Sequence, residues 1–382
     1  MSLQPFAPAT SLVPLTSVGY QQLGGAHDSH TSGWRSVLGG RQSLPAVIAC
    51  IGDSTAAGFG PGISTWSQSW PAILNFLANE RYPTQNLSTH GRGLLLPQLS
   101  GGTMTANYIT AQTGTADAIP DTGLALNAFE MSTGGGVSWT YSLVGTTAYL
   151  FWAYQPGGGS FTWTLDGGSP QTVDTSADGY NDTGFTAVTL DSTPGNPHTL
   201  VIAYVADSGP VQFDGLGEAN GDETLGLQVY NAAVSGTTAQ DWAGYSWQQW
   251  TTVATPTLYL VNLGVNDWQT GRSSAQFKAD LQTVIANAKS QVDGNARGFI
   301  LNAIMLDTQV SEAEPWSNFV NAMYAIAAAD TSVDVLDWTA GRMPPILAGN
   351  QPNEIYDSVS GELTAAGHGM VADFVVTYIG PA

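Results

Sequence analysis

Three short blocks of this sequence carry groups that could attack an acyl bond. A Gly-Asp-Ser turn ends at Ser54, a Ser-Gly pair ends at Gly236, and a Gly-Val-Asn-Asp segment contains Asn266. A serine hydroxyl can act as a nucleophile, and backbone N–H groups or an uncharged amide can donate hydrogen bonds to a developing oxyanion. We therefore expect Ser54 to be the nucleophile, with the Ser54 and Gly236 N–H groups and the Asn266 side chain forming an oxyanion hole.

An apolar, strand-like run precedes each block, and these runs must bring the blocks together. They are Val47–Ile51, Leu225–Tyr230 and Thr257–Leu263. Short apolar runs of this kind are typical of buried parallel strands. Because the carboxyl ends of parallel strands meet at one edge of a sheet, we expect the three blocks to lie close together.

Outside residues 100–224, predicted helices alternate with predicted strands. The apolar spacing predicts the following helices: Ser67–Tyr82, Ala275–Val292, Pro315–Ala329 and Thr364–Ile379. Two further strands are predicted, Gly298–Leu306 and Ser332–Leu336. This alternation predicts an α/β fold with a mostly parallel sheet.

Residues 100–224 have a different pattern, without helical periodicity. In Ser160–Leu165, apolar residues alternate with serine and threonine, which is typical of a strand with one buried face. Similar runs separated by glycine-rich turns predict an inserted all-β sandwich. We therefore expect an N-terminal arm at 1–32, an α/β unit formed by 33–99 and 225–382, and a β insert at 100–224 between its two parts.

The blocks resemble those of the SGNH (GDSL-type) hydrolases, at IGDSTAAG, NAAVSG and LGVNDW. The resemblance covers about 33–96 and 225–380, and it implies a three-layer α/β/α sandwich. It also implies esterase or deacetylase activity on acyl esters, often acetylated carbohydrate, with Ser54 as nucleophile and Gly236 and Asn266 in the oxyanion hole. The β insert resembles the jelly-roll module of some bacterial and phage-associated members.

The sequence departs from this family at the general base. The family usually shows an Asp, two residues and then the catalytic His, just before the last helix. Asp357 fits the acid, but the residue three positions later is Ser360, and the nearest histidine is His368 in the predicted helix.

Three interpretations of this departure remain open. His368 could be the base, oriented by Asp357. Another group, Glu362 or His90, could activate Ser54. The site could also be degenerate, which would leave a weakly catalytic or binding module, such as a phage virion or tail component that recognises host glycans. Without a base, a serine hydroxyl is a weak nucleophile.

Composition excludes some partners. The net charge is −21 with only nine Lys and Arg residues, so no basic patch for nucleic acid or an anionic membrane can form. We expect an acyl ester or acetylated glycan as substrate, no metal and no organic cofactor. Oligomerisation through the arm or the insert is compatible with the sequence.

The single cysteine and the N-terminus bear on the compartment. Cys50 lies within the first apolar run, so we expect a small buried side chain and no internal disulfide. The first residues lack a basic start and a long apolar run, so they do not predict a signal peptide. The compartment is therefore undetermined, and an extracellular, cell-surface or virion location is compatible with the sequence.

Overall fold

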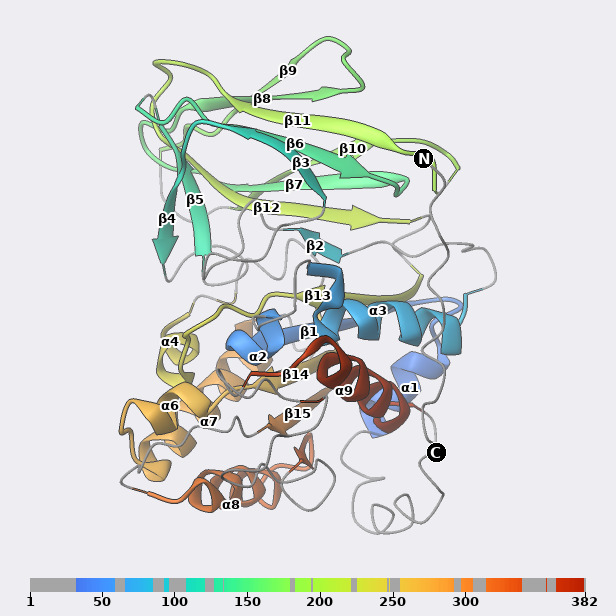
Figure 1. Cartoon of the computed structure of the whole chain (residues 1–382), viewed down its shortest axis with the longest axis vertical. Coiled ribbons are helices and arrows are strands. Elements are labelled where there is room, and N and C mark those ends of the chain that lie inside the picture. Colours follow the sequence, from blue (N-terminus) through green and yellow to red (C-terminus); the bar gives the residue numbers. More distant parts are fainter. Residues whose placement is uncertain are drawn as a thin grey trace.

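The computed structural model describes residues 32–380, except 59–65, 85–92, 96–107, 121–126, 133, 179–182, 194, 221–224, 246, 248–254, 292–296, 305–313, 339–354 and 356–361. Figure 1 shows two parts, a β-rich part above and a mixed part of helices and strands below. The N-terminal arm and Asp357 lie outside the described residues, as does His90.

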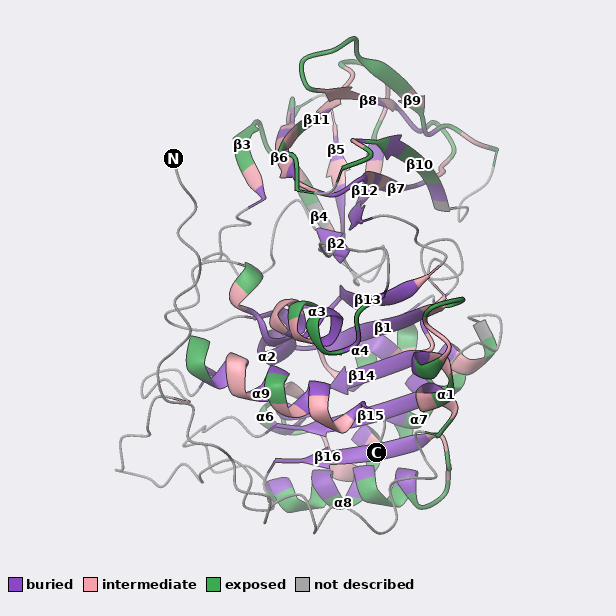
Figure 2. Ribbon diagram, turned by 90° about the vertical axis from the view of Figure 1, so that its right-hand side faces the viewer, coloured by how far each residue is buried: buried purple, intermediate pink, exposed green. Residues whose placement is uncertain are grey.

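The lower part is built on a five-stranded sheet in which all neighbouring strands are parallel. Its strands, in spatial order, are β13 (Gly226–Asn231), β1 (Pro45–Gly52), β14 (Leu258–Asn262), β15 (Gly298–Ala303) and β16 (Val333–Asp337). Almost every residue of these strands is buried, as Figure 2 shows. The predicted parallel α/β sheet is thereby confirmed for this part of the chain.

Helices cover both faces of the parallel sheet and make three layers. One face packs against α1 (Ser32–Gly39), α3 (Trp70–Arg81) and α9 (Ala365–Tyr378), and the other against α4 (Ala239–Gly244), α7 (Ser274–Gln291) and α8 (Trp316–Ala327). Strand β1 shows why the sheet needs both layers: Ile48 and Cys50 belong to one apolar cluster, whereas Val47 and Ile51 belong to the other. Among the described residues, no helix has the length and hydropathy to cross a membrane.

The upper part consists of two antiparallel sheets. One contains β10 (Thr183–Thr189), β7 (Thr147–Ala153), β12 (Val211–Ala219), β5 (Asn127–Met131), β4 (Asp117–Pro120) and β2 (Gly93–Leu95). The other contains β3 (Ile109–Thr113), β6 (Ser138–Leu143), β11 (His198–Tyr204), β8 (Ser160–Leu165) and β9 (Gln171–Asp174). This part of the fold is antiparallel, so the mostly parallel arrangement is limited to the lower sheet.

Aromatic side chains join the two antiparallel sheets face to face. The ring centroids of Trp139 and Phe213, from opposite sheets, lie 5.7 Å apart, and those of Trp152 and Phe161 lie 5.5 Å apart. Offset and edge-to-face pairs of this kind add to the stabilisation from buried apolar area. The sheets therefore share one core, as the alternating pattern predicted.

Strand β2 pairs with a strand from the expected β insert. We expected residues 33–99 to belong to the α/β unit, but Gly93–Leu95 pairs antiparallel with Glu218–Leu216 of β12. The same strand also approaches the parallel sheet, since a Cβ at Gly93 would lie 2.3 Å from the carbonyl oxygen of Val229. Strand β2 therefore lies where the two parts of the fold meet.

The order of the parallel strands locates the expected site. Across the sheet, the strand that comes second in the chain (β13) lies beside the first (β1), and the third, fourth and fifth follow on the other side of β1. The direction in which strands are added therefore reverses between β1 and β14. Ligands of open α/β sheets bind beyond the carboxyl ends of the strands at such a reversal. Ser54 follows β1 and Asn266 follows β14, so the two residues lie directly after the two strands that flank this reversal.

Candidate active site

Ser54 begins a short helix directly after the first parallel strand. Strand β1 ends at Gly52, and α2 (Ser54–Ala57) follows, with Gly58 at φ +87° closing it. A Cβ at Gly52 would lie 2.3 Å from the carbonyl oxygen of Asn262 on β14. Only glycine therefore fits where β1 and β14 come closest, and this contact fixes the turn that presents Ser54.

Asp53 holds this turn in place. Its Oδ1 accepts hydrogen bonds from the backbone N–H of Thr55 and from Nδ2 of Asn262, both at 3.1 Å. Asp53 is fully buried, and burial raises the pKa of its carboxyl group to about 7 although both bonds lower it. These contacts give Asp53 a structural role in the turn that carries Ser54.

The hydroxyl of Ser54 is paired with a carboxyl group. Its Oγ donates a hydrogen bond of 3.0 Å to Oε1 of Glu362, which lies just before α9. Both side chains are almost fully buried, at 8% exposure for Ser54 and 9% for Glu362. Burial first, and the nearby charge of Asp53 second, raise the pKa of Glu362 to about 8, while the bond from Ser54 lowers it.

His368, expected as the base, has a different partner. Its Nδ1 accepts a hydrogen bond of 3.0 Å from the backbone N–H of Trp70, the first residue of α3. The ring is fully buried, and burial lowers its pKa to about 3, so the imidazole is neutral. Within the described chain, the structure therefore brings Glu362, and not His368, to Ser54.

The loop after β13 is attached to the loop after β1. Thr237 Oγ1 donates a hydrogen bond of 3.0 Å to the carbonyl oxygen of Gly52, and the N–H of Val234 donates to the same oxygen at 2.9 Å. Gly236 lies between them, exposed and at φ +86°, and a Cβ added to it would have no other atom within 4 Å. The positive φ favours glycine at this position.

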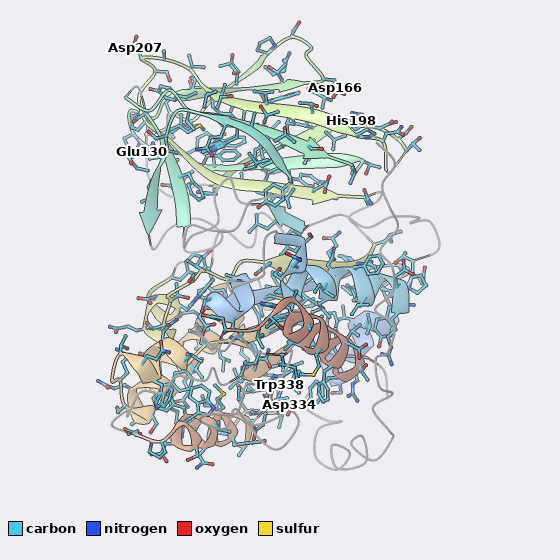
Figure 3. The ribbon with its side chains drawn as sticks, in the orientation of Figure 1. Glu130, Asp166, His198, Asp207, Asp334 and Trp338 are labelled. Carbon is cyan, nitrogen blue, oxygen red and sulfur yellow. The ribbon has the colours of Figure 1, made fainter. Side chains whose placement is uncertain are left out.

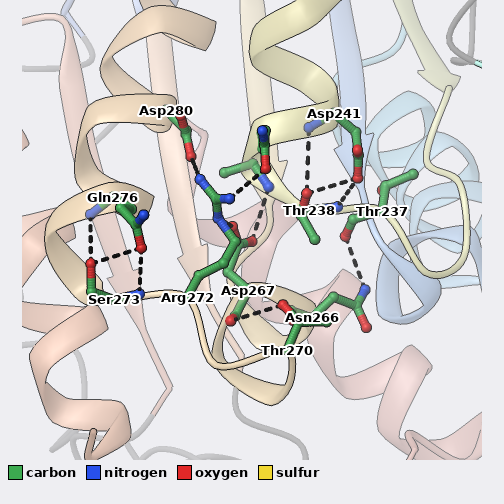
Figure 4. A network of polar contacts seen from close by, with 12 residues as sticks. Thr237, Thr238, Asp241, Asn266, Asp267, Thr270, Arg272, Ser273, Gln276 and Asp280 are labelled. Carbon is green, nitrogen blue, oxygen red and sulfur yellow. Dashed lines mark hydrogen bonds and ion pairs between the residues drawn. The ribbon is translucent and has the colours of Figure 1, made fainter. Parts of the chain in front are cut away.

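Asn266 connects the third block to this loop. Its Nδ2 donates a hydrogen bond of 2.9 Å to the carbonyl oxygen of Thr237, as Figure 4 shows. An amide nitrogen carries two N–H bonds, so a second donor remains for another acceptor. Among the described residues, no group accepts a hydrogen bond from the backbone N–H of Ser54 or Gly236. The segments that carry the three predicted oxyanion donors are thus linked by hydrogen bonds, from Thr237 to Gly52 and from Asn266 to Thr237.

Asp267 fixes the position of α6 (Val265–Gln269) in the same network. Its Oδ2 accepts from the N–H of Ala239 at 2.9 Å, and its Oδ1 lies 3.3 Å from Nε of Arg272. Burial raises the pKa of Asp267 to about 6, and the Arg272 charge opposes that shift. Figure 4 shows Arg272 also bonded to Asp280 on α7. These contacts connect α6 to the start of α4 and to Arg272.

Two supporting residues were not identified from the sequence. Asn262 contacts the Asp53 carboxyl group, and Thr237 bonds to Gly52 while its own Oγ1 accepts from Nε1 of Trp242 at 3.1 Å. Asn262 is the last residue of β14, so a polar residue at the end of a buried strand was the available signal. Thr237 carried no comparable signal.

The described part of the chain holds no group of side chains suited to a metal ion. Within the described ranges, no three His, Cys, Asp or Glu side chains are grouped so as to hold a metal ion. Cys50 is buried in β1 with a free thiol whose pKa burial raises, which agrees with the predicted packing role.

Part of the chain matches the sequence model of a known protein family. Residues 195–369 match the GDSL-like Lipase/Acylhydrolase family, a range that includes Gly236, Asn266 and Glu362 and begins after Ser54. No curated protein sequence matches the chain.

The fold also resembles a solved structure. A peptidoglycan O-acetylesterase superposes with a TM-score of 0.67 at 14% sequence identity, covering 93% of this chain and 96% of that one. A family two carbohydrate esterase from Cellvibrio japonicus matches at 11% identity over 71% of this chain and 95% of that one, with a TM-score of 0.30. That second score is too low to indicate a shared architecture, whereas the first shows the same fold.

Proposed function

We propose that this chain, an ester hydrolase with a GDSL-like acylhydrolase domain at residues 195–369, removes acetyl or similar small acyl groups from carbohydrate through an acyl-enzyme on Ser54. The observation that carries the proposal is the hydrogen bond between Ser54 Oγ and a buried carboxyl group at the carboxyl edge of the sheet. The similarity to a peptidoglycan O-acetylesterase supports an O-acetylated sugar as the substrate.

In the proposed reaction, Ser54 Oγ attacks the acyl carbonyl carbon while its proton passes to a base. The carbonyl oxygen becomes an oxyanion, which accepts hydrogen bonds from the Ser54 and Gly236 N–H groups and from Nδ2 of Asn266. Collapse of the intermediate releases the sugar alcohol and leaves an acyl ester on Ser54. Water then attacks this ester, and acid and free enzyme result. Removing one such oxyanion donor typically costs about 100- to 1,000-fold in kcat.

The alternative of a degenerate glycan-binding module receives less support. A degenerate site would leave the serine without a proton acceptor, whereas Ser54 Oγ has one at 3.0 Å. We therefore propose catalysis rather than binding alone.

We also propose that the two antiparallel sheets form a jelly-roll-like domain inserted into the hydrolase unit. The proposed division keeps the arm at 1–32, the hydrolase parts at 33–99 and 225–382, and the insert at 100–224. The contiguous strands β3 to β12 support an insert, and β2 is the exception that pairs across its boundary.

The test is acetate release from O-acetylated peptidoglycan and from acetylated xylan, with p-nitrophenyl acetate as a general ester. We expect the wild type to release acetate and Ser54→Ala to lose at least about 1,000-fold in kcat/KM. Ser290→Ala, an exposed serine on α7, is the matched control and should retain full activity. A wild type no faster than Ser54→Ala on all three esters would contradict the proposal.

A further inference from the structure

The partner of Ser54 is a carboxyl group, whereas the resembled family pairs its serine with an imidazole. Glu362 comes two residues before Thr364, the N-cap of the last helix. We propose that Glu362 is the general base of this enzyme, so that a serine–glutamate pair replaces the serine–histidine pair. This inference rests on the proposed ester hydrolysis, because it assigns the proton acceptor of that reaction.

The backbone on each side of the pair is fixed. On one side, Thr364 Oγ1 accepts from the N–H of Gly367, and the Thr364 N–H donates to the carbonyl oxygen of Ile355 at 2.9 Å. Leu363, between Thr364 and Glu362, is fully buried. On the other side, the Asp53 contacts described above hold the Ser54 turn. Both groups therefore need little reorganisation before the proton moves.

The described histidines have other partners. His368 is bonded through Nδ1 to the backbone of Trp70. His198 lies in β11, with Nδ1 2.8 Å from Oδ2 of Asp166. Figure 3 shows His198 and Asp166 in the upper β-rich part, far from the parallel sheet. Among the histidines that the structure describes, neither contacts Ser54, whereas Glu362 is already at hydrogen-bonding distance.

The proton can be followed through both half-reactions. As the bond from Ser54 Oγ to the acyl carbon forms, its O–H bond breaks and the proton moves to Oε1 of Glu362. The protonated carboxyl group then gives this proton to the departing sugar oxygen as the C–O bond breaks. In the second half, Glu362 accepts a proton from the attacking water and returns it to Ser54 Oγ. No oxidant, metal or further reactant is needed.

Only the ionised carboxylate can accept the proton, so activity should depend on pH. The titratable group that faces Glu362 from the β1–α2 turn is Asp53, and its charge adds to burial in favouring the neutral acid. On α9, the His368 ring is neutral and is directed to Trp70. With a pKa of about 8, Glu362 is mostly protonated at pH 7, and the base form increases as pH rises.

The experiment measures kcat/KM for p-nitrophenyl acetate against pH, with the Ser54→Ala rate subtracted at each pH. We expect the wild type to rise with a midpoint near 8, and Glu362→Gln to lose about 100- to 10,000-fold. Glu362→His should regain at least tenfold over Glu362→Gln, with its midpoint moved below that of the wild type. Glu80→Gln, an exposed residue at the end of α3, is the matched control.

Circular dichroism and thermal melting establish that each variant is folded. If Ser54-dependent activity persists in folded Glu362→Gln with an unchanged midpoint, the base assignment is overturned while the ester hydrolysis stands. If His368→Gln, rather than Glu362→Gln, abolishes the pH dependence, the base is His368. A wild type without Ser54-dependent activity would overturn both the base assignment and the proposed function.

Discussion

Asp53 and Glu362 are two buried carboxyl groups that lie close enough for the charge of one to raise the pKa of the other. Asp53 precedes the serine in the chain and binds the backbone of Thr55, whereas Glu362 comes from the segment before the last helix and accepts from the serine hydroxyl. The charge of Asp53 raises the pKa of Glu362, and burial raises both pKa values. The two groups are therefore electrostatically coupled.

This coupling predicts the effect of Asp53→Asn. The amide oxygen can still accept from Thr55 and Asn262, but the negative charge is lost. The pKa of Glu362 should fall, so the midpoint of the kcat/KM profile should move to lower pH by on the order of one unit. Asp280→Asn, a carboxylate on α7, is the control that should not move it. An alkaline shift in Asp53→Asn would refute the coupling.

Glu362→Gln should increase stability at high pH. A carboxyl group whose pKa is raised on folding favours the folded state at low pH, and this contribution is lost as pH rises from about 4.5 through about 8. Glutamine has no such titration, so above pH 8 the variant should exceed the wild type by on the order of 1 kcal/mol or more. Urea unfolding at pH 5 and pH 9 measures the difference. Equal pH dependence in both proteins would count against a raised pKa at Glu362.

His368→Leu should destabilise the fold by about 1–3 kcal/mol, because the buried Trp70 N–H loses its acceptor. The lowered pKa of His368 also predicts a pH effect. The folded state binds this proton only near pH 3, whereas the unfolded state binds it near 6.5, so wild-type stability should fall as pH drops through this range.

The leucine variant should lack this part of the acid destabilisation. Thermal melts between pH 4 and pH 8 separate the two effects. His198→Leu, on the sandwich, is the control for loss of a histidine elsewhere. Identical acid destabilisation in His368→Leu and the wild type would show that the ring is not buried and neutral.

Asn266→Ala should reduce kcat by about 100- to 1,000-fold, since it removes a proposed oxyanion donor. The substitution also removes the bond to Thr237, so a structural effect must be separated from a catalytic one. Asn287→Ala is a matched control, because Asn287 Nδ2 donates a similar bond to the carbonyl oxygen of Ala243 away from the site. A similar loss of activity in both variants would assign Asn266 a structural role only.

Much of the fold was predictable because the parallel strands are buried on both faces. Such strands are continuous apolar runs, and β14 and β16 begin and end close to the predicted positions. Strand β3 could not be found this way, since all but one of its side chains are exposed. Strand β6 was missed although its residues alternate between intermediate and buried, so the pattern was present in the sequence.

The site was predictable only in part, for a physical reason. The ends of parallel strands converge, so strand-end residues such as Ser54 and Asn266 can be grouped from the sequence. The proposed base is not at a strand end, because Glu362 lies in the segment just before α9 and His368 lies on that helix. The structure directs His368 to Trp70 and leaves Glu362, six residues earlier, beside the serine.

Ser54 and Glu362 are separated by 308 positions in the chain, and this separation has a consequence for biosynthesis. At about 5–20 residues per second, a ribosome needs roughly 15–60 s to reach Glu362 after it has added Ser54. During that interval the nascent chain carries the serine without its carboxylate partner. Esterase activity would therefore begin only once α9 has left the exit tunnel and docked, so the onset of turnover in a synchronised translation reaction would report the completion of folding.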